Sequence, residues 1–381
     1  MSVKSLEKER CCGCVACKCA CPNNSIFMQM DEEGFYYPVV QDSCIHCDKC
    51  ERVCPAFNNP NAEIVSSPHF FVTRARDKEI RQRSSSGAIA YSLSKKFLTE
   101  NQIVCGVRMN SDYSYAEHVC IDNIEELDKL LGSKYLQSNT DGIYEKIRCC
   151  IKDDKKVLFI GTPCQVAAVK NVFKNTENII YVDLICHGVP SQFLWKKYHE
   201  YISKKYKSNI NFVNFRDKSR GWEQFGFRAC FENGKSLYVP RGRGFLGLFL
   251  ANICLRPVCG KCEYKGFNRC SDITIGDFWG IERVLPDYEK SNGVSIAMIN
   301  SKKGMDLFKS LGQEIEFEEV ECRDLFQSRN KSLLKPVKIS EKRMAFIEDL
   351  KTMSFPALEN KYLGNPFIVK VKIKVKRLLN K

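Results

Sequence analysis

Two copies of one cysteine motif lie near the start of the chain, 33 residues apart. In the first copy, Cys11, Cys14 and Cys17 follow the spacing C-x2-C-x2-C, and Cys21 stands directly before Pro22. Such a loop presents three thiolates to one compact object, which is typical of cysteines that bind 4Fe–4S clusters. The duplicated motif therefore predicts a small N-terminal domain of the bacterial two-cluster ferredoxin type. The second copy repeats every element of the pattern, with Cys44, Cys47, Cys50, Cys54 and Pro55.

In ferredoxins with two clusters, the fourth cysteine of each motif ligates the cluster that the other motif mainly holds. Gly13 fits the tight turn of the first loop. Cys12 and Cys19 lie outside the ligand spacing, so we expect small side chains beside the cluster at these positions. The rule assigns one cluster to Cys11, Cys14, Cys17 and Cys54, and the second cluster to Cys44, Cys47, Cys50 and Cys21.

The chain contains 22 cysteines in 381 residues. Their clustering at short fixed spacings argues against a disulfide scaffold, whose cysteines spread over loops. The first ten residues, MSVKSLEKER, lack the apolar segment of a secretory signal, and no apolar run approaches the length of a membrane span. We therefore expect a cytoplasmic protein with bound iron.

The formal net charge of +14 falls once clusters are counted. Three 4Fe–4S clusters with their thiolates, at about −2 each, would lower the charge to about +8. No basic motif interleaved with aromatic residues is present, so the remaining charge fits an ordinary surface and we expect no nucleic-acid partner.

Turn-forming residues between Asn58 and Pro68 mark the first boundary of the chain. We expect a ferredoxin domain at residues 1–60, a linker at 61–68, a large domain at 69–330 and a basic tail at 331–381. The tail is expected to be helical or loose. It ends in NPFIVKVKIKVKRLLNK, for which a solvated segment and peripheral contact with a membrane surface are the two interpretations.

The large domain alternates between two kinds of segment. Residues 86–98, 125–131 and 191–206 have the apolar spacing of helices, and residues 225–239 predict a hairpin around Asn233-Gly234. KKVLFIG, TPCQVAAVKNVF and NIIYVDL predict a βαβ unit. The fold class is therefore mixed α/β, with a small ferredoxin domain in front. The expected strands are HFFVTRA (69–75), QIVCGVRM (102–109), KKVLFIG (155–161), NIIYVDLIC (178–186), DITIGDF (272–278) and GVSIAMI (293–299).

A third group of cysteines follows in the large domain. Cys259-x2-Cys262 is a good pair of metal ligands, and half of a zinc ribbon would look the same. Two more thiolates must come from elsewhere. The candidates are Cys254 and Cys270 nearby, or Cys164 and Cys186, which follow predicted strands at the edge where α/β sheets place their chemistry.

At these residues the chain resembles the beta subunit family of coenzyme F420 hydrogenase/dehydrogenase, in a form with an N-terminal ferredoxin domain. The similarity spans roughly residues 10 to 280. The motifs that carry it are SSSGAIA (84–90), GSKYLQS (132–138), LFIGTPCQVAAV (158–169), DLICHGVPS (183–191), FRDKSRGW (215–222) and LRPVCGKCEYKGFNRCSDITIGDFWG (255–280).

The resemblance implies a flavoprotein that holds FAD and a third 4Fe–4S cluster. It favours Cys164, Cys186, Cys259 and Cys262 as ligands of that cluster. Similar stand-alone bacterial proteins imply a setting in polysaccharide biosynthesis. The implied partners are a redox partner protein or a small electron carrier, namely ferredoxin, NAD(P)H or F420.

With FAD implied, three further segments become candidates for its binding. Ser84, Ser85, Ser86 and Gly87 precede a predicted helix, whose N-terminus suits a pyrophosphate. Ser133 is a small residue for close approach, Lys134 offers a cation for a phosphate and Tyr135 a ring for stacking. Gly161 and Thr162 form the turn before Cys164, and His187 is the candidate proton or hydrogen-bond donor.

We therefore expect an iron–sulfur flavoprotein oxidoreductase that passes electrons between FAD and 4Fe–4S clusters. Two alternatives remain. One is an electron-transfer protein without flavin that serves a separate enzyme, and the other is an interaction protein stabilised by zinc at Cys259 and Cys262.

Overall fold

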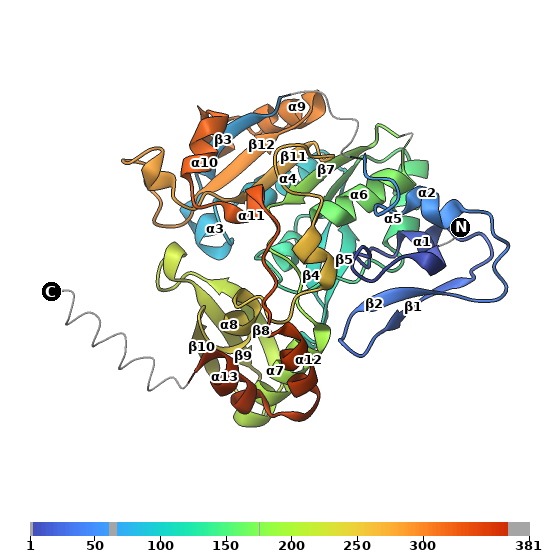
Figure 1. Ribbon diagram of the computed structural model, residues 1–381. Helices are drawn as coiled ribbons and strands as arrows, with labels where there is room; N and C mark the ends of the chain where they lie inside the picture. The colour runs from blue at the N-terminus through green and yellow to red at the C-terminus, as the bar shows by residue number, and fades with distance from the viewer. Residues whose placement is uncertain (1–2, 61–66, 175, 365–381) are drawn as a thin grey trace.

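A computed structural model describes residues 3–60, 67–174 and 176–364 (Figure 1). Most of the predicted linker 61–68 lies outside these residues, and the lysine-rich end of the chain lies wholly outside them. No described helix combines the length and the apolar character needed to cross a membrane.

The N-terminal segment folds as two short helices and a two-stranded antiparallel sheet, in which Ile26 pairs with Val40. The helices lie next to each other and carry cysteines of the two motifs (Figure 1). The elements are α1 (Ala16–Ala20), β1 (Ile26–Met30), β2 (Tyr36–Val40) and α2 (Lys49–Val53).

An eight-stranded sheet forms the centre of the large domain, in the order β13-β3-β12-β11-β7-β6-β4-β5. Strands β11, β7, β6 and β4 run parallel, and the pairs outside them are antiparallel. The strands are β3 (His69–Ala75), β4 (Ile103–Met109), β5 (Ala116–Ile121), β6 (Val157–Gly161), β7 (Ile179–Leu184), β11 (Ile273–Asp277), β12 (Ser295–Ile299) and β13 (Ile315–Val320).

Helices cover both faces of this sheet, because alternate strand residues are apolar on both sides. On one face Val104 and Leu158 pack against α4 (Ile89–Thr99) and α9 (Lys302–Ser310). On the other face Cys105 and Phe159 pack against α5 (Ile143–Lys152) and α6 (Pro163–Val172). Helix α3 (Lys78–Arg83) follows β3.

A second, three-stranded sheet stands beside the large one (Figure 1). It packs on an aromatic core around Trp195, Phe215 and Phe245. Its elements are α7 (Gln192–Tyr206), β8 (Ile210–Asp217), β9 (Gly226–Phe231), β10 (Ser236–Pro240), α8 (Gly244–Leu250), α12 (Arg343–Thr352) and α13 (Phe355–Leu363). The remaining short elements in the large domain are η3 (Leu127–Leu130), η4 (Trp222–Gln224), η5 (Pro257–Lys261), η6 (Ile281–Arg283), η7 (Gly312–Glu314), α10 (Cys322–Gln327) and α11 (Lys331–Leu334).

The mixed α/β fold predicted from the sequence is confirmed, including all six strands, the βαβ unit β6–α6–β7 and the hairpin at Asn233-Gly234. Residues 125–131, predicted as helical, form the 3-10 helix η3 instead of an α-helix. Beyond residue 330 the chain continues as α11, α12 and α13, and Phe346, Leu350 and Phe355 join the aromatic core. The described part of the expected tail is therefore packed.

Candidate cofactor sites

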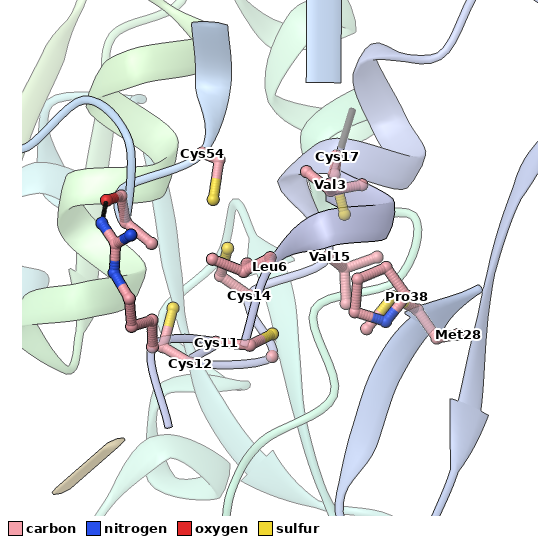
Figure 2. Close-up of a pocket in the computed structure, with 13 residues that line it drawn as sticks. Val3, Leu6, Cys11, Cys12, Cys14, Val15, Cys17, Met28, Pro38 and Cys54 are labelled. Carbon is pink, nitrogen blue, oxygen red and sulfur yellow. Dashed lines mark hydrogen bonds between the residues drawn. The ribbon is translucent and has the colours of Figure 1, made fainter. Parts of the chain in front are cut away.

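Four cysteines of the N-terminal motifs converge on one pocket. Cys11, Cys14, Cys17 and Cys54 line it, together with apolar side chains such as Val3 (Figure 2). Burial raises the pKa of Cys17, and it raises the pKa of Cys54 to about 11; neighbouring thiols add to both shifts. Buried thiols that repel one another as thiolates need a positive partner, and iron supplies it. This is the group that the spacing assigns to one cluster.

The two motifs have the same backbone, although their sequences differ between the cysteines. Gly13 and Val15 have φ of 67°, and the residues 33 positions later, His46 and Asp48, have φ of 50° and 56°. Helices α1 and α2 then begin and end at equivalent residues, with Cys21 and Cys54 directly behind them. Val15, His46 and Asp48 are not glycine, so the left-handed conformation strains their backbone. An ordinary turn would not require this strain. Both loops therefore keep the shape that wraps a cluster.

The other four cysteines of the motifs are Cys21, Cys44, Cys47 and Cys50. Cys50 is buried beside Cys17 and Cys54, and Cys21 packs against the same small core. Cys44 and Cys47 are half-buried. The backbone N–H of Ser25 points at the sulfur of Cys21, at 3.3 Å. These positions follow from the repeat, since Cys44, Cys47 and Cys50 occupy in the second loop the places of the first three cysteines.

The ferredoxin segment is held to the large domain by hydrogen bonds to its first cysteine loop. The buried Arg256 donates from Nε to the Cys11 carbonyl at 2.8 Å and from Nη2 to the Tyr36 carbonyl at 2.7 Å. Tyr144 donates to the Cys14 carbonyl at 2.6 Å, and Thr140 donates to the same oxygen at 3.0 Å. Because three of these four hydrogen bonds end on carbonyls of the loop itself, the large domain fixes the shape of this loop.

A second cavity, of about 310 Å³, lies where the large domain meets this loop, and it is lined by Cys12 of the loop and by four cysteines of the large domain. Cys164 is in the first turn of α6, two residues after the capping residue Thr162. Cys186 follows β7, Cys259 is in η5 and Cys262 ends it. The pKa of Cys186 is raised to about 12 by burial, although the ammonium of Lys265 acts against this. These are the four cysteines that the resemblance implies.

The two remaining candidates from this part of the sequence lie elsewhere. Cys254 is fully buried in the aromatic core, and its sulfur contacts the Leu248 carbonyl. Cys270 is buried near Asp183 and Lys170, on the α6 side of the large sheet. Neither lines the cavity that holds the other four cysteines. Both side chains have the environment of small core residues.

Cys12 lies between the first pocket and the second cavity. It lines both of them, and its thiol has side-chain hydrogen bonds with Cys14 on one side and Cys164 on the other. The spacing places Cys12 outside the ligand pattern, and the sequence offers no signal for this contact because it does not show where the thiol points. The structure thus adds one residue that connects two predicted metal sites.

The third cavity is larger than the second, at about 470 Å³, and opens along the ends of the parallel strands. It is lined by most of the residues expected to bind FAD. Gly87 is the exception, since a Cβ at this position would lie 2.7 Å from the Thr73 carbonyl and 2.8 Å from the Ser295 nitrogen. Because Gly87 has no Cβ, its backbone can lie directly against Thr73 in β3 and Ser295 in β12. The expected residues on the cavity wall are Ser85, Ser86, Ser133, Lys134, Tyr135, Gly161, Thr162 and His187.

Three buried polar atoms on the wall of the third cavity lack a protein partner. They are Ser84 Oγ, Arg216 Nε and Asn330 Nδ2. Arg216 Cζ also lies 4.1 Å from the ring centre of Phe225. Buried donors without acceptors are costly, so they indicate a polar ligand that completes them. A ligand with both rings and phosphate or carbonyl oxygens fits this wall.

The charged group at this cavity has a fixed geometry. Arg216 donates to both carboxylate oxygens of Asp277, at 2.7 and 2.9 Å, and its Nη1 donates to the Tyr135 hydroxyl at 3.2 Å. Trp222 Nε1 donates to Asp277 at 2.7 Å and stacks on Trp279. Such a bidentate pair holds the orientation of Tyr135 before any ligand arrives.

Lys134 lies at the cavity, but its ammonium donates to the carbonyls of Leu130 and Leu131, both at 2.8 Å. It therefore caps the end of η3. Burial lowers the pKa of Lys134 to about 7, so the side chain can exchange a proton near neutral pH. Its role as a phosphate cation stays a prediction.

His187 stands on the wall shared by the second and third cavities. Its Nε2 lies 2.7 Å from Asn252 Oδ1, and its Nδ1 lies 3.4 Å from Ser332 Oγ. An amide oxygen accepts, so the proton of the neutral ring belongs on Nε2. Burial lowers the pKa of His187, which keeps the ring neutral, with Nδ1 as the acceptor that faces the Ser332 hydroxyl.

Comparison with known proteins identifies the family. Residues 70–143 match the N-terminal part, and residues 154–324 the C-terminal part, of the coenzyme F420 hydrogenase/dehydrogenase beta subunit. The chain belongs to this family. Membership, together with the cysteine motifs, indicates an oxidoreductase that transfers electrons through iron–sulfur clusters.

Individual relatives are distant. The uncharacterized protein MJ1349 of Methanocaldococcus jannaschii is 21% identical over 348 residues, which cover 81% of this chain and 89% of the relative. The uncharacterized ferredoxin MJ0722 of the same organism is 34% identical over 50 residues, 13% of this chain and 65% of that protein. A solved chain of the F420-reducing [NiFe] hydrogenase complex from Methanosarcina barkeri aligns with 19% identity and a TM-score of 0.49, over 75% of this chain and 93% of that one.

Proposed function

We propose that this chain is an iron–sulfur flavoprotein with three 4Fe–4S clusters and one FAD. The clusters are assigned to the two N-terminal sets and to Cys164, Cys186, Cys259 and Cys262. The observation that carries the proposal is the contiguity of the three cavities: Cys12 lines the first and second, and His187 lines the second and third.

The third cavity is assigned to FAD on its polar wall. Bound there, FAD would exchange electron pairs with one partner and single electrons with the clusters. Arg216 and Asp277 hold Tyr135 in place, and the unpartnered Ser84 and Asn330 would complete their hydrogen bonds on the ligand. FAD would lie close to five small residues of the wall, namely Ser85, Ser86, Ser133, Gly161 and Thr162. His187 Nδ1 would accept a proton at the wall toward the second cavity.

A zinc site at Cys259 and Cys262 has less support than a cluster. Four thiolates around one zinc ion lie about 2.3 Å from the metal and therefore close to each other. Within the described residues, no group of three or more His, Cys, Asp or Glu side chains is arranged to hold a single metal ion. A cubane of four irons and four sulfides holds its thiolates further apart, in keeping with a cavity between them.

Purification without oxygen tests the proposal. About twelve irons and one FAD per chain are expected, and Cys164→Ala or Cys259→Ala should lower the iron to about eight while the FAD remains. Cys254→Ala is the matched control, since this buried cysteine lies outside the cavity, and it should keep about twelve irons. A protein with both N-terminal clusters but no flavin after every preparation would support the flavin-free alternative.

The partner is proposed as a ferredoxin, NAD(P)H or F420, because the chain belongs to a family of hydrogenase and dehydrogenase subunits. Offering each in turn to the reduced or oxidised protein, and following the absorbance of flavin and clusters, identifies it. The setting in polysaccharide biosynthesis and the cytoplasmic location stay predictions from the sequence.

A further inference from the structure

Three cysteines that lie outside the proposed cofactor sites gather at one edge of the large sheet. Cys105 in β4 faces Cys120 directly across the antiparallel pair with β5, and their sulfur atoms lie 3.5 Å apart. Cys150 in α5 packs beside them, and its thiol hydrogen bonds to Cys120. In the sequence these residues have no ligand spacing, and only the pairing of the strands brings them together.

The backbone already allows a bond between the first two. Residues that face each other in an antiparallel pair have Cα atoms about 4.5 or 5.5 Å apart, and disulfides occur at about 4.4 to 6.8 Å. Cys105 and Cys120 satisfy this in either kind of pair. The sulfur atoms need only a change of side-chain rotamer to close the remaining gap.

The two sulfurs differ in environment. Cys105 is fully buried, and burial raises its pKa. The pKa of Cys120 is lowered, first by its hydrogen bond with Cys105, then by the positive charge of Lys146 and by Cys150. Cys120 is also partly exposed, so it is the sulfur that a small reagent can reach. A reactive thiolate beside a buried thiol is the arrangement of an attacking and a resolving cysteine.

We propose that Cys105 and Cys120 form a peroxide-reactive dithiol that closes to a disulfide. The Cys120 thiolate attacks one oxygen of hydrogen peroxide, the O–O bond breaks, and Cys120 becomes a sulfenic acid while hydroxide leaves and takes up a proton. The Cys105 thiol then attacks the Cys120 sulfur, the S–S bond forms and water leaves. Two thiols lose two electrons and two protons, and one peroxide becomes two waters.

This site is separate from the proposed electron path. The side chain of Cys105 is on the face covered by α5 and α6, whereas the next residue, Gly106, lines the third cavity on the opposite face. Failure of the dithiol would therefore leave the flavin and cluster assignments untouched. In a reducing cytoplasm, disulfides of this kind are transient and respond to oxidants.

Peptide mapping of the full chain tests the proposal. The protein, purified without oxygen, receives one equivalent of hydrogen peroxide, free thiols are alkylated, and disulfides are located by mass spectrometry. A cross-link between the peptides of Cys105 and Cys120 is expected, at least about tenfold above any disulfide of the exposed Cys322. If Cys120 is still alkylated to the same extent as Cys322, the proposal is wrong.

Variants separate the roles of the residues. Cys105→Ala should leave Cys120 as a sulfenic acid that dimedone traps, whereas Cys150→Ala should keep the cross-link. Lys146→Gln should slow alkylation of Cys120 near neutral pH severalfold, while Lys152→Gln on the same helix should not. Loss of the free Cys105 thiol to peroxide at the parent rate in Cys120→Ala, or equal rates for the two lysine variants, contradicts the assigned chemistry.

Discussion

Replacing Arg256 by Met should lower the reduction potential of the cluster assigned to Cys11, Cys14, Cys17 and Cys54. The Arg256 side chain is fully buried, and its Nη2 lies 3.8 Å from the Cys11 sulfur. It also lies over the Tyr37 ring, with Cζ 4.4 Å from the ring centre. A guanidinium stays protonated at any ordinary pH, and a positive charge favours the state with one more electron. Without this charge, reduction becomes harder.

The size of the effect follows from the distance. At 3.8 Å a unit charge is worth about 1 kcal/mol in a dielectric of about 80 and about 4 kcal/mol at about 20. For one electron these energies correspond to about 50 and about 190 mV. The added electron spreads over a cluster that lies further from Arg256 than the sulfur does, so a decrease of about 50 to 100 mV is expected.

Redox titration followed by electron paramagnetic resonance measures this potential. Arg256→Lys keeps the charge but loses the planar guanidinium that donates to the Cys11 and Tyr36 carbonyls, so it should recover more than half of the decrease. Arg343→Met is the matched control, because this buried arginine bonds Glu33 and the Leu255 carbonyl, away from the assigned cysteines. A potential for Arg256→Met within about 20 mV of the parent, or an equal decrease in Arg343→Met, would refute the reasoning.

Three further changes test the packing around the sites. Gly13→Ala and Gly142→Ala both place a side chain at positive φ, which costs about 1 to 2 kcal/mol each. Only at Gly13 would the new Cβ also meet Arg256 Nη1, at 2.7 Å. The midpoint of thermal unfolding and the iron content should therefore fall further in Gly13→Ala than in Gly142→Ala. Burial lowers the pKa of His118 to about 4 in the native chain, whereas its pKa in the unfolded chain is about 6.5. As the pH falls below about 6.5, the unfolded chain therefore binds a proton at His118 that the native chain does not bind. The free energy of unfolding should drop by about 2 kcal/mol between pH 6.5 and 5, and His118→Gln should remove this slope, as denaturant titrations can show. Asp277→Asn leaves the buried Arg216 uncompensated and should cost about 3 to 5 kcal/mol, measured in the same way; unchanged stability would contradict the role of this ion pair.

The sequence predicts the fold well where a local pattern determines it. The strands of the large sheet are short runs of β-branched residues, and the parallel ones are buried on both faces, so their apolar character is visible without partners. Gly13 is equally visible, because the turn at this position needs φ of 67°. His46 has the equivalent position in the second loop, with φ of 50°, but a histidine in the sequence does not indicate this conformation.

Contacts between distant segments are beyond such patterns. Spacing alone leaves six cysteines as candidates for a third metal site, and the family resemblance favours four of them. The folded chain places those four around the second cavity, away from Cys254 and Cys270. Lys134 can be recognised as a cation near a predicted phosphate, but not as the cap of η3. In both cases the deciding partner is a backbone group or side chain whose position depends on tertiary structure.

Tertiary contacts also join the second cavity to the first cysteine loop. Arg256 is three residues before Cys259, so one short segment supplies a ligand candidate to the second cavity and the hydrogen bond to the Cys11 carbonyl. Cys12, next to Cys11, then reaches Cys164. Any shift of the ferredoxin loop against the large domain changes both contacts together. The two cavities are therefore one structural unit, and the fixed docking of the loop is itself part of the proposed electron-transfer site.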